Sequence, residues 1–158
     1  MTQHNAPNVQ APNVKTQRIV VLALAAGQTL FAIVTGVLVQ SEDGKGIGEE
    51  GIPILATVAI AAMIAAPILA YVLRGVLSKR ADGVPAGPAR DQADFAAILV
   101  PAAMLEGGGL LCTVSWLING GLLPYVIGSA LCICLTLMLM PSGNAGKDSI
   151  DLSEGGTR

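Results

Sequence analysis

Residues 95–118 read FAAILVPAAMLEGGGLLCTVSWLI, and this stretch decides the fold class. It is long enough to cross a bilayer as a helix, since a hydrocarbon core of roughly 30 Å needs about 20 helical residues. Its one charged residue, Glu106, lies near the middle. A carboxylate at that depth costs roughly 2.5–3.5 kcal/mol on insertion scales, so it must face protein or water or be protonated. Glu106 is therefore the residue at which the sequence points to a function.

Three further apolar runs, at 19–39, 52–77 and 122–140, are also long enough to span a bilayer. The 158 residues are 53% hydrophobic and 13% charged, whereas soluble domains carry about 25% charged residues. Backbone polar groups in lipid must be satisfied internally, and no alternating pattern suggests a barrel. The sequence therefore predicts an all-α integral membrane protein, with one four-transmembrane-helix bundle at residues 18–140.

The segments outside the apolar runs are polar. Residues 1–17 contain APNV twice, and residues 141–158 are rich in Gly and Ser. Such compositions bury little, so both segments are predicted to be disordered or flexible cytoplasmic tails. The central segment 81–94, ADGVPAGPARDQAD, contains two prolines and two glycines and is interpreted as a flexible hinge between two hairpins.

A weak internal repeat relates the first and third runs. Residues 25–39 can be aligned with 103–118, which places Gln28 opposite Glu106 and Thr35 opposite Thr113. Both copies lead through a proline into the next run. Apolar helices also align by chance, so two duplicated hairpins and four unrelated helices both remain open.

The depths of Gln28 and Glu106 match if both helices cross in the same direction, since each lies near the middle of its run. Small residues flank both at helical spacing, so the two helices are expected to approach closely, with the Gln28 amide bonded to Glu106. Thr113 completes the candidate ion-binding set. The candidate helix-packing residues are small ones in the second and third runs: Gly107, Gly108, Gly109, Ala59, Ala62 and Ala66. This constellation suits proton or cation handling, and equally a polar contact that holds helices or subunits together.

Other function classes have little support in the sequence. The cysteines Cys112, Cys132 and Cys134 lie within apolar runs and are interpreted as small apolar packing residues. We expect no metal site, no cofactor and no enzymatic activity, because no ligand set, nucleophile–base pair or phosphate loop is visible. A net charge of −2 predicts no nucleic-acid partner. The expected partners are the lipid bilayer and further copies of the chain or other membrane subunits.

Residues 52–118, with the core AAMLEGGGLLCTVSWLI at 102–118, resemble the proteolipid (c) subunit of rotary ATP synthases and ATPases. That family has a helix rich in small residues, a polar cytoplasmic loop, and a helix with a mid-membrane carboxylate that carries a proton or sodium ion. The resemblance implies that Glu106 is an ion carrier. The chain differs from the family in its alanines where the family has a glycine repeat, its longer loop, and its first and fourth runs.

The basic residues predict the orientation. Of nine Lys and Arg residues, only Lys45 lies in the first connection, 41–51. The other eight lie in or next to the tails and the central connection, with Arg74 at the end of the second run. Lys and Arg are enriched in cytoplasmic loops, so both termini and the central connection are expected in the cytoplasm, with the protein in the cell inner membrane.

A cysteine replacing Asp43 is expected to react with a membrane-impermeant thiol reagent added from outside the cell. Asp43 lies in the first connection, 41–51, whose only basic residue is Lys45. The measurement uses a background in which the three native cysteines have been replaced, and a cysteine at Arg80 serves as the control on the other side. Reaction of the Asp43 position from the cytoplasmic side only would reverse the topology.

Overall fold

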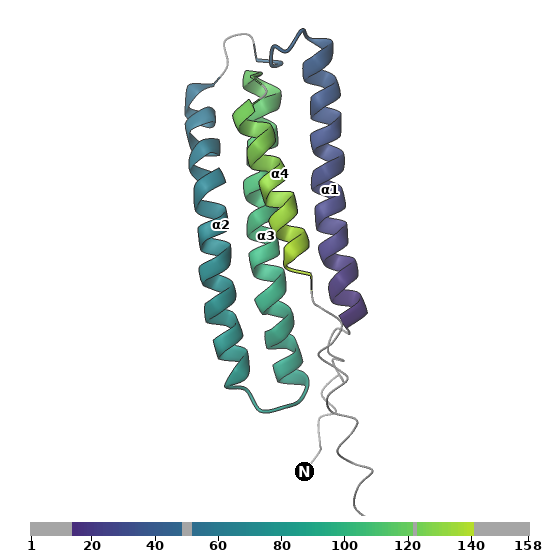
Figure 1. The fold of residues 1–158 in the computed structure, drawn as a ribbon, viewed down its shortest axis with the longest axis vertical. Helices are drawn as coiled ribbons and strands as arrows, with labels where there is room; N and C mark the ends of the chain where they lie inside the picture. Colours follow the sequence, from purple (N-terminus) through teal and green to yellow (C-terminus); the bar gives the residue numbers. More distant parts are fainter. Residues whose placement is uncertain (1–13, 49–51, 122, 141–158) are drawn as a thin grey trace, which may run out of the picture.

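The computed structural model describes residues 14–48, 52–121 and 123–140, and Figure 1 shows that these form a long bundle of roughly parallel and antiparallel helices. The helices are α1 (Val14–Ser41), α2 (Pro53–Asp82), α3 (Pro88–Asn119) and α4 (Leu123–Met138). The prediction of an all-helical chain with four helices is confirmed. Three of the helices are long and apolar enough to cross a membrane, and α4 is apolar but has only 16 residues.

The bundle is arranged around α3, which contacts each of the other helices. α1 and α2 lie on opposite sides of the α3–α4 pair and do not contact each other in the described part of the chain (Figure 1). The two halves of the proposed repeat therefore pack differently, because α3 and α4 form a contacting antiparallel pair whereas α1 and α2 are separated. The structure lends no support to a duplicated pair of hairpins.

Two of the expected boundaries were wrong. α1 begins at Val14, so the last four residues of the predicted tail are helical, while 1–13 and 141–158 lie outside the described residues. The predicted hinge is also much shorter than 81–94, since α2 continues to Asp82 and α3 begins at Pro88. Proline suits the first turn of a helix, where no backbone N–H is needed. An ion pair between Arg90 and Asp82, at 3.6 Å, joins the two helix ends.

The α2–α3 contact depends on small side chains. An added Cβ at Gly108 would lie 2.7 Å from the Cβ of Ala66, so the two backbones approach as closely as a glycine permits. Ala59 and Ala66 are buried, and Ala62 is half-buried beside them. Gly107 differs from its neighbours, since it is exposed and an added Cβ there would meet nothing within 4 Å. Within the described chain, Gly107 is therefore not a packing residue.

The connection after α1 folds over the C-terminal end of α3. The backbone N–H of Ile47 donates to the carbonyl of Leu117 at 2.9 Å, and that of Gly48 donates to Ile118 at 3.1 Å. The last carbonyls of a helix have no partner within the helix, so these bonds satisfy groups that water or another segment would otherwise have to meet. The side-chain carbonyl of Asn119 accepts a further bond from the N–H of Ile52, just before α2. One end of the bundle is thereby tied together.

Gly108→Ala is expected to lower the free energy of unfolding of the solubilised monomer by about 1–3 kcal/mol, because the new methyl group meets Ala66 in a packed seam. Gly107→Ala is the matched control in the same helix. It gains the same helix propensity, about 1 kcal/mol, and meets no neighbour. Reversible unfolding in mixed micelles would measure both. Equal effects of the two substitutions would show that the seam does not have this close packing.

Candidate polar site

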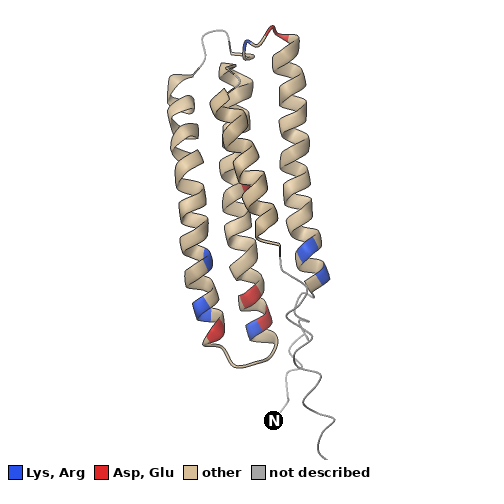
Figure 2. Ribbon diagram, in the orientation of Figure 1, with Lys and Arg blue, Asp and Glu red and all other residues tan. Residues whose placement is uncertain are grey.

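Glu106 lies midway along α3, at the edge of the surface that faces the other helices. Its side chain is half-buried, and the neighbouring Ala103 and Gly107 are exposed. Figure 2 shows the charged residues gathered at the two ends of the bundle, apart from a red segment within α3. In the described part of the chain the Glu106 carboxylate makes no hydrogen bond and no ion pair. The structure therefore provides this carboxylate with no partner of its own.

Gln28 is fully buried in α1, with 0% of its surface exposed. Its side-chain nitrogen donates to the backbone carbonyl of Ser129 in α4, at 3.4 Å. The amide is packed against Gly109, where an added Cβ would overlap the amide nitrogen. The absence of a side chain at Gly109 thus provides the space that the Gln28 amide occupies.

The expected hydrogen bond between Gln28 and Glu106 is not formed. Gln28 faces Gly109, three residues further along α3 than Glu106, which is about 4.5 Å along the helix axis and about 60° around it. Gln28 therefore packs against α3 nearly one helical turn away from Glu106. The physical reason is steric, because the bulky amide settles where α3 carries no side chain.

Thr113 is fully buried and joins α3 to α4. Its hydroxyl lies 2.9 Å from the carbonyl oxygen of Gly109 and 3.1 Å from the hydroxyl of Ser129. A hydroxyl has one hydrogen, so when Thr113 donates to Gly109 the Ser129 hydroxyl donates to Thr113. Ser129 therefore links the two predicted residues Gln28 and Thr113, one through its carbonyl and one through its hydroxyl. Gln28, Thr113 and Ser129 form a three-helix polar cluster that does not include Glu106.

Ser129 was not among the residues predicted for the site. The signal that could have found it is its spacing of seven from Thr136, which places both hydroxyls on one face of α4. Both side chains are buried, and Thr136 donates to the carbonyl of Cys132 at 2.9 Å. The polar residues of α4 therefore face α1 and α3, while its exposed surface carries apolar side chains such as Leu131.

The α1–α3 seam also contains buried polar atoms without a protein partner. They are the side-chain oxygens of Gln28 and Thr35 and the indole nitrogen of Trp116. Thr29, Thr57 and Thr113 each bond the carbonyl four residues back, as helical threonines commonly do. Thr35 does not. The described residues therefore leave unused an amide oxygen that can accept, an indole N–H that can donate, and a hydroxyl that can do both.

The structure contains no group of three or more potential metal ligands among its described residues. Cys112 and Cys132 are buried between helices, whereas Cys134 is exposed. The thiol of Cys112 lies 3.7 Å from the carbonyl oxygen of Ala59, a weak contact across the α2–α3 seam. Cys112 and Cys132 are therefore small buried packing groups, as the sequence predicted, whereas Cys134, for which the same was predicted, is exposed.

Comparison with known proteins gives no relative: no protein-family model, no curated protein and no solved structure matches the chain.

Gln28→Leu is expected to change the free energy of unfolding by less than about 1 kcal/mol. The substitution loses one long hydrogen bond, worth about 0.6 kcal/mol on average in membranes, and also removes an unpaired buried oxygen. Gln28→Ala has the same chemical losses but leaves a cavity, so it is expected to cost about 2–4 kcal/mol. Unfolding of the two variants in the same micelles provides the comparison. If Leu destabilises as much as Ala, the amide holds the helices together through polar contacts rather than through volume.

Proposed function

We propose that the chain is a small multi-pass membrane protein that assembles with further copies of itself or with other membrane subunits, through the outward side of α3 around Glu106. The observation that carries the proposal is the state of Glu106: half-buried, at mid-length of an apolar helix, and without a partner in the described chain. Ionisable groups at such depth usually face other protein or a water-filled cavity. A neighbouring subunit would supply that environment. The proposal gives the chain no catalytic role.

The shape of α3 near Glu106 supports a close contact between helices. Ala103 and Gly107, on either side of Glu106 along the chain, are exposed and small. Small residues on one helix face allow another helix backbone to approach, and a polar side chain beside them then finds a partner across the contact. Since Ala103 and Gly107 are exposed, the described helices leave this side of α3 uncovered.

The proposed topology has four spans with both termini in the cytoplasm. The distribution of charge supports it, since the basic residues of α1, α2 and α3 lie at one end of the bundle and the described connection at the other end carries Glu42 and Asp43 (Figure 2). α4 extends about 24 Å at 1.5 Å per residue, a little short of a typical hydrocarbon core. Local thinning of the bilayer would accommodate a span of that length.

The second candidate is proton or cation translocation with Glu106 as the carrier. It is favoured by the same carboxylate, which the chain leaves reachable from outside the bundle rather than locked into an internal hydrogen bond. The resemblance of 52–118 to rotary proteolipid subunits supports the same role. Gln28 and Thr113, the other two members of the predicted ion-binding set, bond Ser129 instead of Glu106, so a bound ion would have to draw its other ligands from a neighbouring subunit.

The comparison of Glu106→Gln with Glu106→Leu separates the two functions. For an assembly contact, Gln is expected to preserve the oligomer because it keeps hydrogen-bonding capacity, while Leu is expected to weaken it about tenfold or more through the loss of a polar contact. For a carrier, Gln is expected to preserve the oligomer but abolish proton flux in proteoliposomes. Glu42→Gln, an exposed carboxylate in the connection after α1, serves as the control for charge alone.

Cross-linking reports on the assembly face directly. A cysteine replacing Gly107 is expected to form disulfides between copies of a homo-oligomer, or adducts with another subunit, in a background without Cys134. Gly27 is the matched control, since it is also exposed and an added Cβ there also meets nothing within 4 Å. Equal cross-linking at positions 27 and 107, together with an oligomer that is unchanged in Glu106→Leu, would refute the assembly face.

A further inference from the structure

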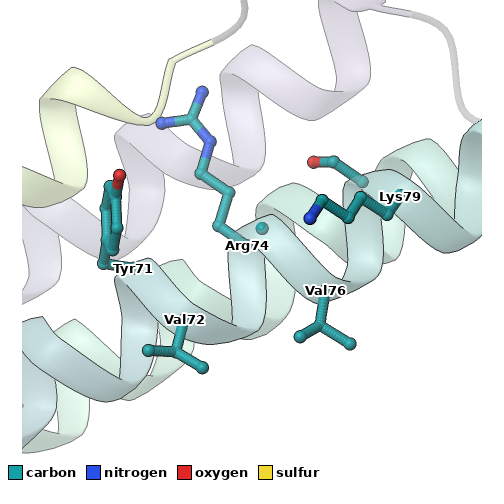
Figure 3. A pocket seen from close by; sticks show the side chains of 7 residues that line it. Tyr71, Val72, Arg74, Val76 and Lys79 are labelled. Atoms are coloured by element: carbon teal, nitrogen blue, oxygen red, sulfur yellow. The ribbon is translucent and has the colours of Figure 1, made fainter.

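A second polar feature lies on the outward side of α2, far along the helix from Glu106. Residues from Tyr71 to Lys79 line an open pocket of about 560 Å³. Figure 3 shows Tyr71, Arg74 and Lys79 rising from one side of the helix, and Val72 and Val76 pointing to the other. Tyr71 is 82% exposed. The pocket thus combines an aromatic ring, two cations and an apolar flank on a surface that no other helix of the described chain covers.

The pocket lies at the depth of a membrane interface. Tyr71 comes 18 residues after Pro53, which begins α2, and this corresponds to about 27 Å of helix. A hydrocarbon core is roughly 30 Å thick, so Tyr71 falls at its edge and Arg74 and Lys79 lie beyond it. Tyrosine is enriched at that level because its ring suits the apolar side and its hydroxyl the polar side. The lining residues therefore change from apolar to cationic where lipid acyl chains give way to headgroups.

The two cations of the pocket have no acidic partner among the described residues. Arg74 and Lys79 form no salt bridge with any described residue, whereas Arg90 pairs with Asp82 nearby at 3.6 Å. The guanidinium group offers a planar fork of donors that matches phosphate oxygens, and the ammonium group adds a second charge. Ser78, also in the lining, contributes a hydroxyl. The free charge of the pocket is complementary to a phosphate group.

Gly75 forms the floor of the pocket. It lies between Tyr71 and Lys79 on the same helix face, at spacings of four in each direction. An added Cβ at Gly75 would meet nothing within 4 Å, so no packing contact explains the glycine. Any larger side chain there would occupy the space between the ring and the ammonium group.

We propose that this pocket binds the headgroup of an anionic phospholipid from the adjacent leaflet. The phosphate would lie between Arg74 and Lys79 over Gly75, with the Ser78 hydroxyl within reach, and the acyl chains would descend along the valines and the Tyr71 ring. Lipid is the source that the location favours, because the site opens toward the side of α2 where acyl chains and headgroups meet. The site is separate from the α3 face around Glu106; it rests on the proposed membrane-spanning topology but not on the assembly role.

The test measures lipid binding to the full chain by native mass spectrometry, with phosphatidylglycerol compared against phosphatidylcholine. The wild type is expected to retain phosphatidylglycerol selectively. Arg74→Gln and Lys79→Gln are each expected to weaken this binding about fivefold, the effect of about 1 kcal/mol per basic residue near an anionic surface. Arg80→Gln is the matched control, because it removes an exposed charge at the same end of α2 but does not line the pocket.

Gly75→Leu tests the pocket without changing any charge. It is expected to abolish selective retention without lowering the unfolding temperature, since the added side chain meets no protein atom near its Cβ and leucine has a higher helix propensity than glycine. Three results would overturn the proposal: equal weakening by Arg80→Gln and Arg74→Gln, full retention in Gly75→Leu, or no preference for phosphatidylglycerol over phosphatidylcholine. Displacement of the lipid by millimolar inorganic phosphate would also overturn it, in favour of a soluble anion as the ligand.

Discussion

The close approach of α3 to its neighbours at two adjacent glycines is the constraint on which the bundle depends. Gly108 lies against Ala66 of α2 and Gly109 against Gln28 of α1, and Cys132 of α4 contacts the same two positions. α1, α2 and α4 therefore all contact α3 at two consecutive residues. In lipid, apolar side chains gain little from meeting one another, and helix association rests on tight packing and polar contacts. Larger residues at these two positions would push α1, α2 and α4 away from α3.

Backbone groups at the end of the bundle, beside the connection after α1, also find their hydrogen-bond partners within the protein. Gly46 and Gly120 approach so closely there that a side chain on either would overlap the other's backbone, and both Gly120 and its neighbour Gly121 have positive φ values, 67° and 73°. These glycines let the connection reach the last carbonyls of α3, where Ile47 and Gly48 donate hydrogen bonds. The helix that organises the core is thus also the one whose end is capped by the first connection.

The helices could be predicted from the sequence because each apolar run is long enough to determine its own conformation in lipid. The interhelical register could not. The rotation of α3 about its axis decides which of its three successive glycines faces which helix. Gly107 was expected to pack but is exposed, and Gly109 packs against Gln28. The polar cluster was predicted only in part. Gln28 and Thr113 were identified, but Ser129, which joins them, was missed although its spacing of seven from Thr136 places both hydroxyls on one face of α4. Glu106 was identified by its charge alone.

The position of Gln28 has a consequence for how the chain is made. α1 leaves the ribosome before α3 and α4 have been synthesised, yet the one hydrogen bond that its buried amide makes within the described residues is to Ser129 in α4, 101 residues later. During that interval the amide has neither Gly109 to pack against nor a carbonyl to bond, so the first helix must remain in the membrane through its apolar residues alone. α1 can pack against Gly109 once α3 is present, but its amide gains a hydrogen-bond partner only when the last helix has arrived.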